Sequence, residues 1–569
     1  MNQLPRNRPL PATLRSVTCI ARGAYSHAER ESVSKPSTGY FVCRQSCWTT
    51  AALVVAAVWG FGGLAWGQRD GGTAGASGAQ RQLPQINLGP MTNGPAWAQP
   101  FLLIGHTDVP TRLAVSADGR RLASGGADGT VRVWDLVERR ELLKRDKFHT
   151  ILGASHLRPR SLALSPDGQR VAYGTADNRV VAYEVNTGQV LLEEKIAPGP
   201  RLRDARGQPV ARQVFGLAFA PDSQRLAVAV SILQMNDSTV DVYCLTNRQK
   251  LVSVGGLGGM ARSLAWAGQG AYLAVGENQN VRLHDATDGR LLHTWAPSQN
   301  RIVYLGASPD GRILATWTTG ENMRAPVEFW TVPDATPAGN PVAYPCEAGQ
   351  RNRLQWSDDG RFLMLQDRGT MQLYDLATAN RPQICTYRQE DQNGRLLGIV
   401  DAVMLPDGRR LAAALGTGQV LIRSLAPDQA RPLTDDEQIA AAWRALANPA
   451  PADASVEAAP SYVAAWSLAF SGERARRFLE TRLAEARQGA PGAAAWVNQL
   501  DADEFAARLQ AFESLTALGI SARPALLAAR DHPSLEVREK VSQLLARADR
   551  LWSNVELALK LMPDAARAR

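Results

Sequence analysis

The sequence predicts an all-β fold, a seven-bladed β-propeller, followed by an α-helical C-terminal region. The propeller is predicted by a four-residue turn that recurs roughly every forty to fifty residues, with short strands of alternating polarity on both sides of it. The helices are predicted by a change of hydrophobic period from two to 3.6 after residue 430. The chain has 569 residues, of which 45% are hydrophobic, so it can form two or three structured units.

The N-terminal part of the chain is expected to lie outside these units. Residues 1–50 are rich in arginine and read as a basic, disordered segment. Residues 51–67 carry no charge and are interpreted as a secretory signal or a membrane anchor, with Ala65 and Gly67 at the −3 and −1 positions of a cleavage site. A buried core helix is the alternative interpretation. Residues 68–98 are rich in Gly, Gln, Ala and Pro and predict a flexible linker.

The recurring turn has the form Ser-Pro-Asp-Gly, best seen at Ser165–Gly168. Proline presets the backbone angle of the second turn position, and glycine accepts the positive φ at the end, so each copy predicts a hairpin turn. Seven copies indicate seven supersecondary units. The other copies are Ser116–Gly119, Ala220–Ser223, Ala267–Gly270, Ser308–Gly311, Ser357–Gly360 and Leu405–Gly408.

Each turn lies between two apolar strands, and a third and fourth strand follow. In the first unit we expect strands at Thr111–Val115, Arg121–Ser124 and Val131–Trp134, and four strands per unit define a propeller blade. The seventh unit has only three strands before the helices begin. We expect Pro100–Ile104 to pair with its last strand, near Val420–Ser424, which would close the ring and leave no open edge.

These features resemble the WD40 repeat family over residues 99–427. The best stretch runs from Gly105-His106 through Gly125–Gly129 to Trp134-Asp135. The resemblance implies a structural hydrogen-bonded tetrad within the first blade, made of His106, Ser124, Asp128 and Trp134. A histidine, a serine and an aspartate also invite interpretation as a hydrolase triad, but a set that ends on a tryptophan favours packing. No other blade repeats the full tetrad.

The tail, residues 433–569, is expected to be α-helical. Thr434–Glu437 predicts a capping box, and Asp501 with Glu504 predicts a second one, in which Leu500 would staple to Phe505. Residues 503–548 resemble HEAT-like repeat units, and the whole tail resembles the helical extension of many bacterial WD40 proteins.

The leading functional hypothesis is a protein-binding scaffold that is exported or membrane-anchored in a bacterial envelope. We expect a protein or peptide partner, contact with a membrane through residues 51–67 if they are not cleaved, and no nucleic acid, because the basic charge gathers near the N-terminus. A possible partner-binding loop contains Arg201, Arg203 and Arg206.

An enzyme with its active site at the channel mouth, or a fixed component of an envelope assembly, are the alternatives. The sequence offers no catalytic motif, no phosphate-binding loop and no spacing of ligands for a metal or cofactor, so no catalytic, cofactor-binding or metal-binding residue is predicted. The six cysteines are too scattered for a disulfide framework.

Overall fold

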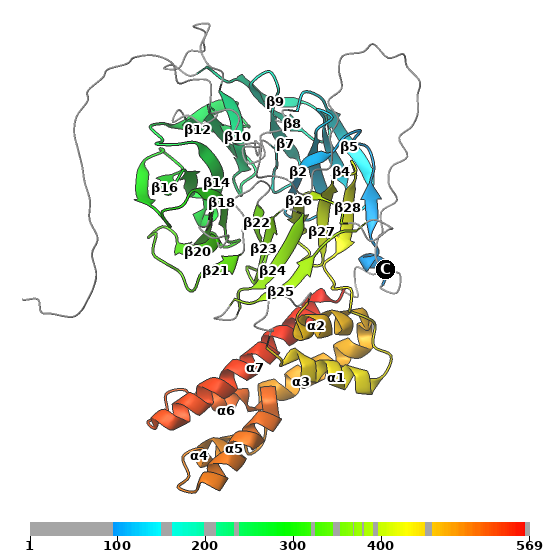
Figure 1. Cartoon of the computed structure of the whole chain (residues 1–569), viewed down its shortest axis with the longest axis vertical. Helices are drawn as coiled ribbons and strands as arrows, with labels where there is room; N and C mark the ends of the chain where they lie inside the picture. Colours follow the sequence, from blue (N-terminus) through cyan, green and yellow to red (C-terminus); the bar gives the residue numbers. More distant parts are fainter. Residues whose placement is uncertain are drawn as a thin grey trace, which may run out of the picture. The chain divides into compact units, whose positions relative to one another are not determined.

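A computed structural model describes most of the chain after residue 94 (Figure 1). The described residues are 95–148, 162–198, 212–232, 238–319, 325–344, 353–367, 369–377, 381–390, 396–449 and 458–563. Residues 1–94, and with them the predicted signal or anchor at 51–67, lie outside the described residues. No helix within the described ranges is both long and apolar enough to cross a membrane.

Seven four-stranded antiparallel sheets form the ring, as the sequence predicts. Blade one contains β2 (Pro110–Val115), β3 (Arg121–Gly126), β4 (Val131–Asp135) and β5 (Arg140–Arg145), and blade two contains β6 (Leu162–Leu164), β7 (Arg170–Gly174), β8 (Arg179–Glu184) and β9 (Val190–Lys195). Blade three contains β10 (Gln213–Phe219), β11 (Arg225–Ser231), β12 (Ser238–Cys244) and β13 (Gln249–Val254). Blade four contains β14 (Ala261–Ala267), β15 (Tyr272–Glu277), β16 (Asn280–Asp285) and β17 (Leu291–Trp295), and blade five contains β18 (Ile302–Ala307), β19 (Ile313–Thr318), β20 (Ala325–Thr331) and β21 (Val342–Tyr344). Blade six contains β22 (Arg353–Trp356), β23 (Phe362–Asp367), β24 (Thr370–Asp375) and β25 (Gln383–Tyr387).

The seventh blade is built from both ends of the propeller sequence. Its sheet order is β1 (Phe101–Leu103), β28 (Val420–Ser424), β27 (Arg410–Leu415) and β26 (Ile399–Met404). Leu102 lies opposite Leu421 in the antiparallel register of β1 and β28. The predicted closure is therefore confirmed, and the edge that β28 would otherwise expose is paired.

The recurring turns join the first and second strands of the blades. In blade one the Ser116 hydroxyl donates to Asp118 at 2.6 Å, the same carboxylate accepts the backbone N–H of Arg120 at 3.0 Å, and Gly119 has φ +67°. The turns also contact one another, because the backbone N–H of Ala117 donates to the carbonyl of Pro166 in the next blade at 2.8 Å. The motif thus fixes both the hairpin and its spacing from the neighbouring blade.

The C-terminal region is helical, as predicted. It contains α1 (Asp436–Leu446), α2 (Pro460–Phe470), α3 (Gly472–Gln488), α4 (Ala493–Gln499), α5 (Phe505–Leu518), α6 (Arg523–Ala528) and α7 (Leu535–Leu561). The cap of α1 lies one residue later than the predicted box: Asp435 accepts the backbone N–H of Gln438 at 2.8 Å, and the Gln438 side chain accepts the N–H of Thr434.

The predicted capping box and staple at the start of α5 are wrong. Asp501 still belongs to the turn that ends α4, where its N–H donates to the carbonyl of Asn498, and the N-cap of α5 is Glu504 without a side-chain cap bond. Leu500 is fully buried, whereas Phe505 is 70% exposed, so these two side chains do not staple. The end of α5 at Gly519 agrees with the prediction.

An arginine has the same contacts at the starts of α5 and α7. Arg508 Nη1 donates to the carbonyls of Ala502 and Asp503 at 2.8 and 3.0 Å. Arg538 Nη1 donates to the carbonyls of His532 and Pro533 at 2.7 and 2.9 Å. The two stretches are therefore copies of one local structure, which supports the HEAT-like interpretation; that interpretation itself stays a prediction.

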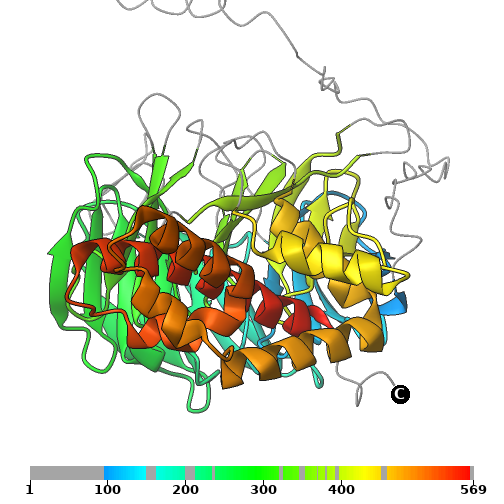
Figure 2. The same ribbon diagram turned by 90° about the horizontal axis from the view of Figure 1, so that it is seen from below.

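The helical region docks on blades six and seven. Arg361, directly after the turn of blade six, donates to the carbonyl of Ser553 and, at 2.7 Å, to the side chain of Asn554. Lys560 pairs with Asp359 at 2.6 Å, and Arg409 donates to two carbonyls at the end of α7. Figure 1 shows α2 and α7 next to β24 and β25, and Figure 2 shows the helices gathered on the same side of the ring.

An apolar core is continuous across this junction. It includes side chains of β23 to β28 together with buried residues of α1, α2, α3 and α7, among them the fully buried Trp466. Trp97, which precedes β1, stacks on Trp466 with 6.2 Å between ring centroids. The tail is thus an extension of the propeller core.

Candidate functional site: the central channel

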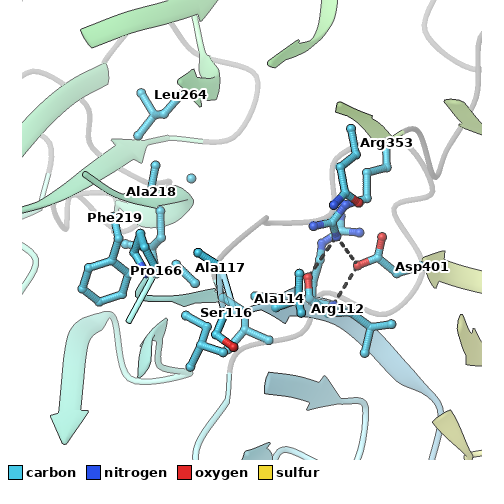
Figure 3. Close-up of a pocket in the computed structure, with 18 of the residues that line it drawn as sticks. Arg112, Ala114, Ser116, Ala117, Pro166, Ala218, Phe219, Leu264, Arg353 and Asp401 are labelled. Atoms are coloured by element: carbon cyan, nitrogen blue, oxygen red, sulfur yellow. Dashed lines mark hydrogen bonds and ion pairs between the residues drawn. The ribbon is translucent and has the colours of Figure 1, made fainter. Parts of the chain in front are cut away.

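The first strand of each blade faces the centre of the ring and lines a cavity of about 400 Å³ (Figure 3). Its walls come from β2, β6, β10, β14, β18, β22 and β26, and its mouth is formed by recurring turns, including Ala117, Pro166, Asp358 and Pro406. Each blade contributes only a few lining residues, so the cavity exists only in the closed ring.

One ion pair and its hydrogen bonds connect three blades within this cavity. Arg353 of blade six contacts Asp401 of blade seven at 2.9 Å, and the same Asp401 oxygen accepts the backbone N–H of Leu113 in blade one at 2.8 Å. Arg353 Nη1 also donates to the Leu113 carbonyl at 2.9 Å. These bonds are drawn in Figure 3. Together they fasten the junction at which the two ends of the propeller sequence meet.

Burial and charge act in opposite directions on this pair. The Asp401 side chain is 3% exposed and that of Arg353 is 19% exposed. Burial alone would lower the pKa of Arg353, but the neighbouring charge and hydrogen bond of Asp401 outweigh it and raise the pKa above its ordinary value. The guanidinium therefore stays charged and paired.

The rest of the lining is mixed in character. Phe219, Leu264 and Ala218 provide apolar surface on one side, and Tyr304 and Gln355 provide polar groups. At the mouth, burial raises the pKa of Asp358, against the opposing effect of Lys560. The lining contains no histidine or cysteine, and no group of His, Cys, Asp and Glu side chains that could hold a metal occurs in the described part of the chain. This chemistry suits non-covalent capture of a side chain or a short peptide.

The four residues that the sequence singled out in blade one meet in one hydrogen-bonded chain. His106 Nδ1 lies 3.1 Å from both Asp128 oxygens, His106 Nε2 lies 2.8 Å from Ser124 Oγ, and Trp134 Nε1 donates to Ser124 Oγ at 2.8 Å. Ser124 is fully buried and the His106 side chain is 1% exposed. A substrate cannot reach this hydroxyl, so the arrangement serves packing between strands.

Asp128 is held as a carboxylate by this chain. Its burial opposes ionisation, but the hydrogen bond and charge of His106 and the backbone N–H groups of Thr107 and Thr130 outweigh burial, so the pKa of Asp128 lies well below its ordinary range. The predicted partner-binding loop with Arg201, Arg203 and Arg206 lies outside the described residues.

The sequence did not single out Arg353 and Asp401. A signal was present in the strand Ile399-Val-Asp-Ala-Val-Met404, where one carboxylate stands among apolar residues and every position is buried. A buried carboxylate requires a partner, but the partner is 48 residues away in another blade.

Comparisons with known proteins agree with the fold. Residues 98–135 match the family model "WD domain, G-beta repeat", and residues 230–310 match the model "Anaphase-promoting complex subunit 4 WD40 domain". The chain therefore carries WD40 repeats in a seven-bladed β-propeller with a C-terminal helical region.

Two curated proteins are similar over a single short stretch. The chain is 50% identical over 44 residues to "Transcription factor unc-37" of Caenorhabditis elegans, which is 8% of this chain and 7% of that protein. It is 52% identical over 42 residues to "Protein groucho" of Drosophila melanogaster, which is 7% of this chain and 6% of that protein. The matched stretch thus spans less than a tenth of each relative.

Proposed function

We propose that this protein is a scaffold whose propeller binds a protein partner at the mouth of the central channel. The cavity is the observation that carries the proposal: it is preformed, opens between the recurring turns, and combines apolar walls with polar groups that include the paired charges of Arg353 and Asp401. Because the site is already formed, a projecting side chain or loop can bind without the entropy cost of ordering the propeller.

We further propose that the protein meets this partner after export, or while tethered to a membrane. The support is the uncharged run at residues 51–67, preceded by a basic segment and containing Ala65 and Gly67 at the spacing of a cleavage site. The propeller would then be held away from the membrane by residues 68–94, because residues 96–98 of the predicted linker form a short helix that packs on the core.

A crosslinking pull-down with a C-terminal tag, from native membrane and soluble fractions, tests both parts. Reading the mature N-terminus by mass spectrometry decides export: we expect a start at Gln68 or recovery of the whole chain in the membrane fraction. An intact N-terminus in the soluble fraction alone would refute it.

The channel is tested in the same pull-down with Ala117→Trp, which places a large ring at the mouth. The matched control is Val137→Trp, because Val137 is 57% exposed on an outer turn and does not line the cavity. We expect the partner to be lost with the first variant and kept with the second. Equal recovery with both variants would show that the partner binds elsewhere.

A further inference from the structure

A second hollow lies in the helical tail, away from the channel. Its volume is about 530 Å³, and it is framed by the end of α1, the end of α5 and the middle of α7. Its floor is apolar: Leu515, Leu544 and Leu551 are buried there, and Trp443 is half-buried with its ring packed edge-on against Phe478. We call this hollow the tail groove.

The tail groove is positively charged. Its lining includes Arg444 and Arg547 and no acidic residue. Both arginines are exposed, and neither forms an ion pair with any described carboxylate. Other cations of the tail do have carboxylate partners, such as Arg474 with Asp436 at 2.8 Å and Arg523 with Asp549 at 2.6 Å. Two exposed guanidinium groups without a carboxylate partner therefore lie beside the apolar floor of the hollow.

The helix ends in the groove do not cancel this charge. The last carbonyls of a helix carry partial negative charge when they lack partners. In α1 the carbonyl of Leu446 accepts the Asn554 side chain at 2.8 Å, and that of Ala445 accepts the N–H of Asn448 at 3.1 Å. At the end of α5 the carbonyl of Leu515 accepts the N–H of Gly519. With these carbonyls occupied, the two guanidinium groups determine the charge that an incoming group meets.

We infer that the tail groove binds an acidic segment of a partner protein, in which an apolar side chain enters the groove and carboxylates flank it. The apolar floor would take the side chain, and Arg444 and Arg547 would pair with the carboxylates. A basic segment, such as residues 1–50 of a second copy, has the wrong charge for this site. The inference does not rest on the channel, because the two hollows share no lining residue.

The inference is tested by fluorescence anisotropy on the full chain with two labelled synthetic helical peptides. One carries leucine on one face and glutamate on the other, and the second has lysine in place of every glutamate. We expect the glutamate peptide to bind, with affinity that falls as salt is raised, and the lysine peptide to bind at least about tenfold more weakly.

Charge reversal then locates the site. The double variant Arg444→Glu/Arg547→Glu should weaken binding of the glutamate peptide about tenfold or more, since it replaces two attractions with two repulsions. Arg530→Glu is the matched control, because Arg530 is exposed and outside the groove; it should change the affinity less than twofold. The milder Arg444→Gln/Arg547→Gln should lie between them and guards against a folding defect. Ala117→Trp should leave this binding unchanged, which separates the result from the channel proposal.

Three results would overturn the inference. The first is no binding of the glutamate peptide, and the second is equal binding by the double variant. The third is a mass in solution that differs between the double variant and the unaltered chain, because the groove would then be covered by a second copy.

Discussion

Replacement of Asp401 by alanine tests whether the channel ion pair holds the ring closed. The substitution removes the carboxylate that accepts from Leu113 N–H at 2.8 Å and from Arg353 at 2.9 Å. It leaves a largely buried guanidinium without its counter-charge and a buried backbone N–H without an acceptor.

The magnitude follows from these two losses. Breaking a buried ion pair by removing one partner costs about 3–5 kcal/mol. An unsatisfied buried donor costs about 1–3 kcal/mol. The cavity admits water to the exposed fifth of Arg353, which solvates part of the stranded charge, so we expect a net loss of about 2–4 kcal/mol.

Thermal melting followed by circular dichroism measures this loss, and for a propeller of this size it corresponds to an apparent melting temperature lower by roughly 3–6 °C. Asp401→Asn should lose less, since its amide oxygen can still accept from Leu113. Arg353→Met combined with Asp401→Asn should lose less than the sum of the single changes, because no charge is stranded. A melting temperature of Asp401→Ala within 1 °C of the unaltered chain would refute the reasoning.

Four further predictions concern other contacts. Ser124→Ala should lower stability by about 2 kcal/mol in urea denaturation, because it strands a buried imidazole and a buried indole N–H; an unchanged midpoint would contradict this. The pKa of Asp128 is depressed in the folded chain, so its carboxylate contributes fully to folding stability above the unfolded pKa of about 4. This contribution is lost as the pH falls below that unfolded value. Melting temperatures between pH 7 and 3 should therefore drop less steeply in Asp128→Asn, and parallel curves would argue against it. Arg361→Ala should release the end of α7 to proteases while the propeller stays resistant, and an unchanged digestion pattern would count against tail docking. Leu103→Asp should unpair β1 and expose the edge of β28, with aggregation visible by light scattering; a monodisperse variant would refute this.

The sequence predicted the propeller well because its signals are local. The turn at Ser165–Gly168 and its copies contain the residues that the hairpin geometry requires. The alternation of apolar and polar residues on either side of each turn predicts the strands. The closing strand was predictable for a different reason, since a three-stranded seventh blade needs a fourth strand and Pro100–Ile104 was the apolar stretch without a place. The four residues of the blade-one network lie within 29 positions of one another, and the structure brings them together.

Three other features were not predicted, and two of them depend on contacts between distant elements. The pair Arg353 and Asp401 forms only when blades six, seven and one surround the channel, and neither residue has a local signature of its partner. The start of α5 was misplaced because the turn after α4 extends through Asp501, which the acidic residue alone does not reveal. The docking of α7 rests on Arg361 and Lys560, and single charges of this kind are indistinguishable in the sequence from solvated ones.

The polar contacts among blades six, seven and one lie where the ring closes, and this placement has a physical reason. Closing the ring joins β1 to β28 across more than 300 residues, and the chain entropy of closing such a loop is about 5 kcal/mol. The strand pairing itself involves only three residues of β1. The same region, however, carries the Arg353–Asp401–Leu113 contacts, and Gln355 of blade six both donates to and accepts from the backbone of Met404 at 2.8 Å.

The docked tail also stabilises this junction. Its apolar core is continuous with blades six and seven, and Trp97 extends that core to the residues before β1. The closing point would be the weakest place in a ring held only by strand pairing. In this protein the closing point is reinforced by the polar contacts of Arg353, Gln355 and Asp401 and by the docked tail. We therefore expect that partner binding at the channel mouth leaves the ring closed, and that loosening of the ring, when it occurs, begins in blades two to five.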